Sequence, residues 1–287
     1  MTFLARGVNR VTEPRRYRLD DLRHYASALT AAAGVAPARA SALATLLLWF
    51  DAAGAPLHGI ATLPDLLHRI DTGEVDPKAE GTVKQERPAT AVLDGGRGVP
   101  LLVLERAAGL AAEKARDCGV GLVRVENTGA TGSAAGIAAE AAIGPVAALV
   151  LGPDARWAVA LPSDAGLPAV FDPALAGDEP VKAGRGRAGA GRQAVDALIG
   201  PWAAALAPGR GWLVAAVSGT AMGPLSAFHA QVAGALQGVE DGGGRLLPGP
   251  WETRRREARE RGVTVNEAAW TALASRAETL GVKPPAP

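Results

Sequence analysis

Short apolar segments alternate with alanine-rich helical segments from about residue 89 onward, and this alternation constrains the fold more than any other feature of the sequence. Two helical segments, 101–118 and 134–143, are each followed by a glycine, Gly119 and Gly144, which favours helix termination. The segments predicted as strands are 90–94, 121–126, 146–151, 157–161 and 169–171. Strands that alternate with helices are typical of an α/β layered fold. The sequence therefore predicts a sheet that is covered by helices.

Both ends of the chain have helical patterns instead. Apolar residues recur at helical spacing over residues 19–29, and two further helices are predicted over 37–54 and 62–73. Near the other end, segment 251–280 predicts two polar helices. We therefore expect three parts: a helical N-terminal segment, 1–88, that packs with the C-terminal helices; an α/β domain, 89–240; and the C-terminal helices and tail, 241–287.

Charge and cysteine content exclude two classes of site. The chain has 30 Lys and Arg residues against 29 Asp and Glu residues, and its net charge is +1. A nucleic-acid-binding protein would usually show a basic excess, so we expect no nucleic-acid partner. The one cysteine, Cys118, cannot form a disulfide within the chain or hold by itself a structural zinc ion, which normally needs four Cys or His ligands. We therefore expect no metal site.

The distribution of apolar residues bears on location. No apolar run reaches the roughly 18 residues that a membrane-spanning helix needs. The apolar stretch that precedes the first arginines is too short to resemble a signal peptide. We therefore expect a cytoplasmic protein that has no membrane partner.

Among the four histidines, His58 is the strongest candidate for chemistry. His24 and His68 fall inside predicted helices, where a surface or half-buried imidazole is the ordinary situation, and the same holds for His229. His58 lies in a short connection between helices, 54–59, and loops carry a large share of functional side chains. Its imidazole could titrate near neutrality and give a proton to a substrate. A structural hydrogen bond is the alternative, and position alone does not separate the two.

A glycine-rich run at 184–189 satisfies the spacing G-x-G-x-x-G. That spacing indicates dinucleotide binding only where it directly follows a strand and opens a helix, and no buried strand precedes it here. We therefore predict an exposed loop over 177–191. The sequence also contains no G-x-S-x-G, Walker or H-E-x-x-H motif, which removes the commonest hydrolase and phosphate-binding templates.

Several segments resemble, in the same order along the chain, the type-2 malate/L-lactate dehydrogenases. HGIATLP at 58–64 and IDTGEVDP at 70–77 are similar to that family's first motif. Further similar segments are AVLDG at 91–95, ARDCGV at 115–120, VRVENT at 123–128, LPG at 247–249 and RGV at 261–263. The family includes sulfolactate, ureidoglycolate, diketogulonate and cyclic-imine reductases.

The resemblance implies an α/β fold in which three layers surround a mixed sheet of the malate/L-sulfolactate dehydrogenase type, with N- and C-terminal helices, rather than a doubly wound Rossmann fold. It implies a homodimer, and it assigns cofactor and substrate to domain 89–240. Members of the family move hydride between NADH or NADPH and a 2-oxo acid, 2-hydroxy acid or imine. A histidine donates the proton, while the cofactor supplies the hydride.

The resemblance also assigns roles to single residues. His58 matches the family's histidine in the first motif and is the expected proton donor, and Asn127 or Thr128 would orient the substrate. The expected cofactor-binding residues are Gly132, Asp172 and Arg210.

Several family residues are replaced in this chain. A second family histidine aligns with Ala130, Thr62 and Leu66 stand where the family tends to have arginine and tyrosine, and Leu57 replaces serine. Threonine cannot reproduce the two-pronged contact that arginine makes with a carboxylate, so substrate recognition must differ.

Two hypotheses follow from these replacements. In the first, the chain is an NAD(P)H-dependent reductase of a small oxo acid, hydroxy acid or cyclic imine, with His58 as the proton donor. In the second, the fold has been repurposed for a non-redox reaction or for binding a partner, and no longer uses a nicotinamide.

Overall fold

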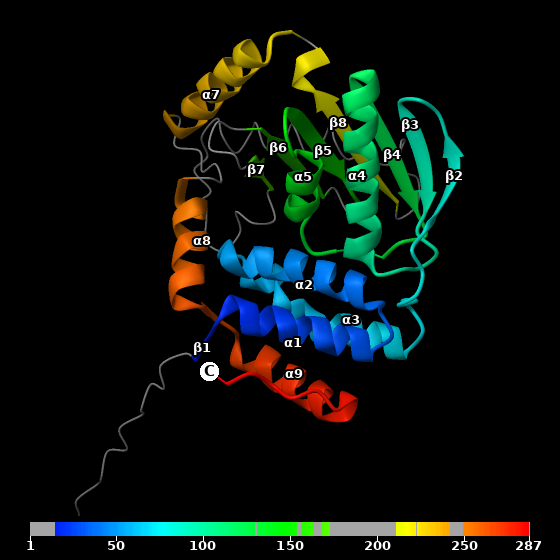
Figure 1. Ribbon diagram of the computed structural model, residues 1–287, viewed down its shortest axis with the longest axis vertical. Helices are drawn as coiled ribbons and strands as arrows, with labels where there is room; N and C mark the ends of the chain where they lie inside the picture. Colours follow the sequence, from blue (N-terminus) through cyan, green and yellow to red (C-terminus); the bar gives the residue numbers. More distant parts are fainter. Residues whose placement is uncertain are drawn as a thin grey trace, which may run out of the picture.

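The computed structural model describes residues 15–129, 131–153, 156–162, 168–172, 211–221, 223–241 and 249–286. Within these residues, a mixed sheet of seven strands forms the centre of the α/β part (Figure 1). Only β3 and β4 pair in parallel, and every other neighbouring pair in this sheet is antiparallel. In spatial order the strands are β2 (Thr82–Glu86), β3 (Thr90–Asp94), β4 (Val120–Glu126), β8 (Trp212–Ser218), β5 (Val146–Leu151), β6 (Trp157–Leu161) and β7 (Ala169–Phe171). The mixed α/β fold that the resemblance implies is confirmed.

Strand β8 corrects the sequence analysis, which predicted no strand at Trp212–Ser218. This strand lies in the middle of the sheet, antiparallel to both β4 and β5. Trp212, Val214 and Ala216 are buried. The segment is a nearly continuous apolar run, which is what a strand covered on both faces needs, but such a run lacks the alternation that marks a strand. Strand β2 was also not predicted, because its sequence is mostly polar and exposed.

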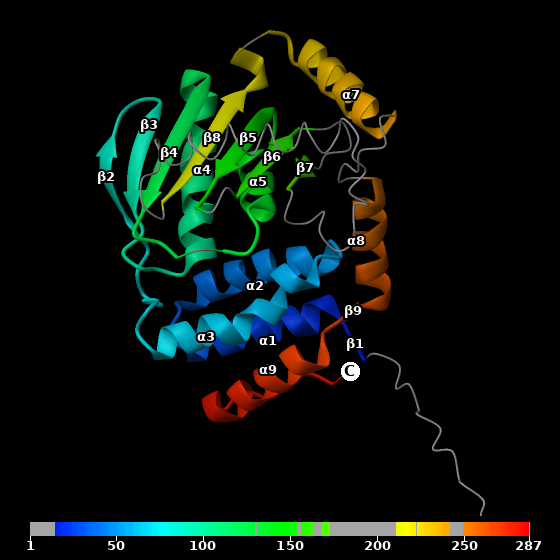
Figure 2. The same cartoon turned by 180° about the vertical axis from the view of Figure 1, so that it is seen from behind.

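Two helices cover one face of the sheet, as Figures 1 and 2 show from opposite sides. They are α4 (Pro100–Cys118) and α5 (Ala135–Ala141), and their alanines are mostly buried. The predicted helix ends are confirmed, since Gly119 and Gly144 both have positive φ angles, +83° and +80°. Helix α4 lies so close to β4 that a Cβ atom at Gly121 would overlap the backbone carbonyl of Ala111. Small residues on both elements therefore set the spacing between helix and sheet.

A layer of helices lies beyond one end of the sheet (Figure 1). Tyr17 stacks on Trp270 with ring centroids 4.1 Å apart, and the hydroxyl of Tyr25 donates to the carbonyl of Leu273 at 3.2 Å. The two ends of the described chain are therefore packed together, and β1 (Arg16–Tyr17) pairs with β9 (Val263–Thr264) beside them. The helices here are α1 (Leu19–Ala32), α2 (Pro37–Ala52), α3 (Leu63–Asp71), α8 (Gly249–Arg261) and α9 (Glu267–Leu280), while α7 (Leu225–Asp241) lies apart.

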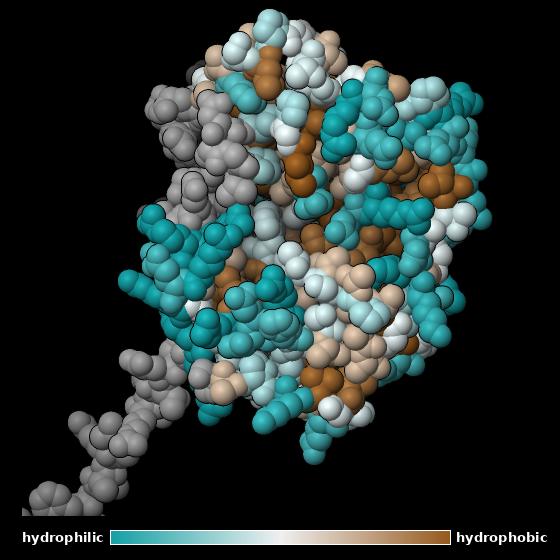
Figure 3. Space-filling model, viewed as in Figure 1, coloured by the Kyte–Doolittle hydropathy of each residue, from teal (hydrophilic) through white to brown (hydrophobic). Residues whose placement is uncertain are grey.

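The N- and C-terminal helices that the sequence predicts are present, with bounds close to those expected. The division into domains 1–88, 89–240 and 241–287 stays a prediction. No helix among the described residues is long and apolar enough to span a bilayer. In the view of Figure 3, apolar residues are exposed near the middle of the face, where the helical layer meets the sheet layer. This junction contains the pocket described next.

Candidate active site

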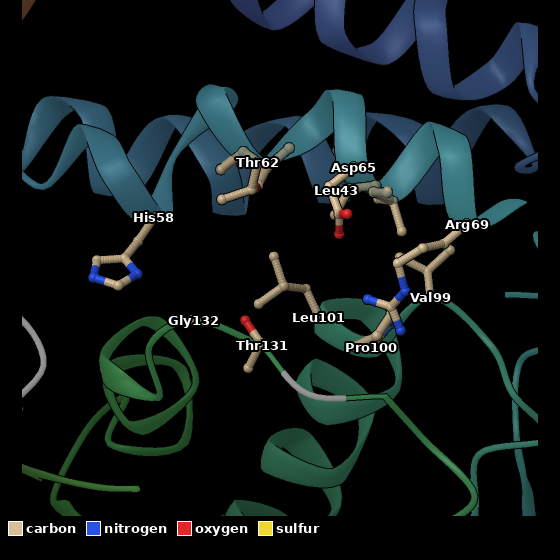
Figure 4. Close-up of a pocket in the computed structure, with 12 residues that line it drawn as sticks. Leu43, His58, Thr62, Asp65, Arg69, Val99, Pro100, Leu101, Thr131 and Gly132 are labelled. Carbon is tan, nitrogen blue, oxygen red and sulfur yellow. The ribbon is translucent and has the colours of Figure 1, made fainter. Parts of the chain in front are cut away.

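A pocket of about 150 Å³ opens between the helical layer and the α/β layer (Figure 4). Its walls come from α2, from the segment that links α2 to α3, from α3 itself, from the beginning of α4 and from the loop after β4. The volume is smaller than the roughly 300–1,000 Å³ of pockets that enclose drug-sized ligands. The described walls therefore fit a small acid or a single ring. The lining residues are Leu43, Leu47, His58, Thr62, Asp65, Leu66, Arg69, Val99, Pro100, Leu101, Thr131 and Gly132.

His58 ends the short 3₁₀ helix η1 (Pro56–His58) and lines one end of the pocket. Its ring centroid lies 6.0 Å from that of Phe50, and the side chain is half-buried. A Cβ atom at Gly132 would lie only 2.6 Å from Nδ1 of His58, so glycine lets the imidazole approach the loop after β4. The histidine selected from the sequence therefore faces a pocket.

A buried carboxyl group, Asp51, supports the segment that carries His58. Its Oδ2 accepts the backbone N–H of Ile60 at 2.8 Å, and a Cβ atom at Gly59 would overlap both of its carboxylate oxygens. Its Oδ1 is buried and has no hydrogen-bond partner among the described residues. Burial raises the pKa of Asp51 to about 7, against a smaller lowering effect of the bond from Ile60. The sequence analysis missed this residue, whose signal is one acid in an apolar helix.

We expect the free energy of unfolding to fall as pH rises from about 4 to about 7 because of Asp51. Its pKa is 3.8 in an ordinary setting and about 7 in the folded chain, so over this range the folded state keeps a proton that the unfolded state has released. Charging the buried carboxylate thus costs stability as pH rises. Urea unfolding at several pH values should show a weaker decline in Asp51→Asn than in the wild type.

The exposed Asp21 provides the control for this measurement, since Asp21→Asn removes a carboxyl group that the fold leaves in solvent. This variant should keep the wild-type dependence of stability on pH. An Asp51→Asn variant that also kept it would show that Asp51 is not the group responsible.

Helix α3 and the turn before it place three polar side chains on the same side of the pocket. Asp65 and Arg69 come three and seven residues after Thr62, a spacing that keeps the three side chains on one helix face. The Oγ1 of Thr62 donates to the carbonyl of Gly59 at 2.8 Å, and Nε of Arg69 donates to Oε1 of Glu74 at 2.8 Å. Sequence reasoning missed Asp65 and Arg69, although their helical spacing from Thr62 was a usable signal.

The two residues expected to orient the substrate do not line this pocket. Asn127 is exposed, has a φ of +49°, and donates from Nδ2 to Oδ1 of Asp94 at 3.1 Å. Thr128 is buried, and its hydroxyl has no hydrogen-bond partner among the described residues. The structure thus brings His58 and Gly132 together at the pocket. Asn127 and Thr128 lie a few residues before Gly132 in the chain, but they do not line the pocket.

Asp172 is buried. It directly follows β7 in the chain, and its side chain lies next to the N-terminus of α5. Its Oδ2 accepts from the hydroxyl of Ser133 at 2.7 Å and from the backbone N–H groups of Ala134 and Ala135 at 3.0 and 3.1 Å. These bonds satisfy N–H groups at a helix N-terminus and hold the loop that contains Gly132. The other residues with predicted roles, Arg210 and Ala130, lie outside the described residues, as does the glycine-rich run at 184–189.

Sequence comparison finds relatives for part of the chain. A family model described as malate/L-lactate dehydrogenase matches residues 17–161, about half of the chain. L-sulfolactate dehydrogenase of Methanocaldococcus jannaschii is 35% identical over 94 residues, which are 33% of this chain and 27% of that protein. Malate dehydrogenase of Pyrococcus horikoshii is 33% identical over 95 residues, 33% of this chain and 26% of that protein. The matched segment thus spans about a quarter of the length of these relatives.

Structural comparison extends over nearly the whole chain. Malate dehydrogenase of Entamoeba histolytica aligns with a TM-score of 0.80 and 16% identity, covering 96% of this chain and all of that one (100%). Sulfolactate dehydrogenase of Methanocaldococcus jannaschii aligns with a TM-score of 0.75 and 20% identity, covering 94% of this chain and 98% of that one. At these identities the likeness establishes the fold.

Proposed function

Because the chain belongs to the malate/L-lactate dehydrogenase family, we propose that it is a reductase that transfers hydride between NADH or NADPH and a small oxo acid, hydroxy acid or imine. The observation that supports this proposal most directly is the position of His58, whose imidazole lines a pocket of the size of a small acid. The homodimer and the cytoplasmic location suggested by the sequence stay predictions.

The described lining fits a nicotinamide ring. Leu47 and Leu101 give apolar walls suited to the face of a ring, and the backbone of Gly132 lies beside His58. Gly132 would contact the cofactor directly, whereas Asp172 would act on it through the loop that its carboxylate holds. A bound reduced nicotinamide supplies the hydride.

The chain itself would contribute a proton donor and a pocket with a partly apolar lining. The ring nitrogens of His58 can carry a proton, so His58 can donate it to the oxygen or nitrogen of the group being reduced. Leu43, Leu47 and Leu101 line the same pocket, and a substrate that displaced water from this apolar lining would make stronger polar contacts. Because Ala130 replaces the family's second histidine, this proposal assigns proton donation to His58 alone.

Binding of NADH or NADPH tests the proposal. A ligand that is present at about 100 times its dissociation constant should raise the free energy of unfolding by roughly 2.7 kcal/mol. We expect one of the two reduced nucleotides to raise the unfolding temperature, and adenosine, which lacks the nicotinamide, to have a smaller effect. Absence of a shift with either nucleotide would sink the redox function and leave the repurposed fold as the explanation.

A further inference from the structure

The pocket contains two side chains of opposite charge on one helix face. Among the described residues that line it, Arg69 is the fixed cation and Asp65 is the carboxylate. They are four residues apart on α3, a spacing at which such side chains often pair. No ion pair joins them among the described residues, because Arg69 pairs with Glu74 instead. The carboxylate of Asp65 and the terminal nitrogens of Arg69 have no ion-pair partner among the described residues, so a ligand in the pocket can contact them.

The surroundings of Arg69 orient its guanidinium group. Its Nε is held by Glu74, whose side chain is 61% exposed, whereas the Arg69 side chain is only 19% exposed. A Cβ atom at Gly129 would overlap Nη2 of Arg69, so the glycine makes room for the guanidinium group. Glu74 occupies the Nε position and leaves the two terminal nitrogens of the fork for another acceptor, the geometry that suits a carboxylate.

Arg69 and His58 lie at opposite ends of the pocket, and Asp65 lies between them on the helical side (Figure 4). Arg69 comes seven residues after Thr62, which is about 10 Å along a helix axis. The family resemblance places Thr62 where an arginine would be expected, so Arg69 supplies the cation of this pocket from another position on the same helix face. A ligand that contacts both His58 and Arg69 must pass Asp65.

We propose that this pocket selects substrates with a single negative charge, which Arg69 binds, and rejects a second anionic group through Asp65. The inference rests on the proposed function for the reaction, but charge selection itself is a property of binding. Like charges a few ångström apart repel weakly in water and more strongly when they are partly buried. Asp65 is exposed, so we expect a preference of about tenfold for a monoanion over a matched dianion.

Two acids of equal chain length test this selection. 2-Oxopentanoate and 2-oxoglutarate differ in that a methyl group of the first is a carboxylate in the second. Their binding can be measured by ligand-observed NMR, without nucleotide and with the oxidised nucleotide, which cannot reduce them, so the measurement needs no turnover. The wild type should bind 2-oxopentanoate about tenfold more tightly. Equal binding, tighter binding of 2-oxoglutarate, or binding of neither acid would overturn the inference.

Variants separate the contributions of the two charges. Asp65→Asn should bring the affinities for the two acids together, and Arg69→Gln should weaken both by at least about tenfold. Arg69→Lys, which keeps the charge without the fork, should weaken binding less than Arg69→Gln. An unchanged preference in Asp65→Asn would show that Asp65 does not reject the second anionic group. Unchanged affinities in Arg69→Gln would show that Arg69 does not bind the first.

Matched controls come from exposed positions on other helices. Asp21 lies in the first turn of α1, as Asp65 does in α3, and Arg116 lies in the last turn of α4. Asp21→Asn and Arg116→Gln should keep the wild-type preference, and loss of it in either would show that net charge alone sets selectivity. Failure of the reductase proposal gives a different pattern: no nucleotide binds, while the preference for the monoanion persists.

Discussion

Replacing His58 by alanine should lower turnover by a factor of about 10² to 10⁴, the usual contribution of a positioned general acid. The imidazole lines the pocket, and the family resemblance places Ala130 where a second histidine would be expected, so no other imidazole is expected to take over the proton. The measurement is single-turnover oxidation of the reduced nucleotide that binds, with the best monoanionic acid or imine as acceptor. Nucleotide affinity should change far less than the rate.

His68 provides the matched control for this experiment, since it lies on α3, near His58 in the chain, and is exposed. His68→Ala should keep the wild-type rate. An unchanged rate in His58→Ala would remove His58 from the proton-donor role, and it would leave the binding predictions for Arg69 and Asp65 standing.

Replacing Trp212 by alanine should destabilise the folded chain by about 3–5 kcal/mol, the range for removal of a large aromatic side chain from a core. Trp212 is completely buried, and it is the first residue of the central strand β8. Its ring fills the space beside Gly152, where a Cβ atom would overlap it. Alanine would leave a cavity on one face of the sheet, beside Gly152. Urea unfolding measures the loss.

Trp212→Phe should cost less than Trp212→Ala because much of the ring volume is kept. Leu57→Ala is the surface control, since Leu57 is 64% exposed and its truncation should change stability by no more than about 0.5 kcal/mol. A loss below 1 kcal/mol in Trp212→Ala would mean that β8 does not contribute to the core as the structure indicates.

The local pattern of the sequence predicts most of the elements but not their arrangement. Helix α4 and strand β5 have clear signals, an alanine-rich helical repeat that ends at a glycine and a short apolar run. Strand β8 has an apolar run like that of β5 but was not predicted, because such a run does not by itself distinguish a strand from a buried helix and because its partner β4 lies far away in the chain. Pairing across such a separation depends on the whole packed core, which no local window contains.

Some residues of the candidate site could likewise be predicted from the sequence, and others could not. His58 could be selected because a loop histidine between helices is unusual, and Gly132 was assigned through the resemblance. Asp51 was missed because its one signal, a single acid in an apolar helix, does not show by itself that the side chain points into the interior. Arg69 was missed for another reason: an arginine in a helix normally lies in solvent, and only the loop with Gly129 brings it to a pocket.

Asp172 has a wider consequence. It directly follows the edge strand β7, and its carboxylate binds three groups at the beginning of α5. Asp172 therefore fastens one wall of the pocket to the border of the sheet, and Arg156, just before β6, adds a bond to the carbonyl of Thr131 in the same wall. A substitution or a contact that displaces β7 would therefore also move the loop that contains Gly132, which lies beside His58. Changes at this border of the sheet can thus alter the rate of the reaction without altering any residue that lines the pocket.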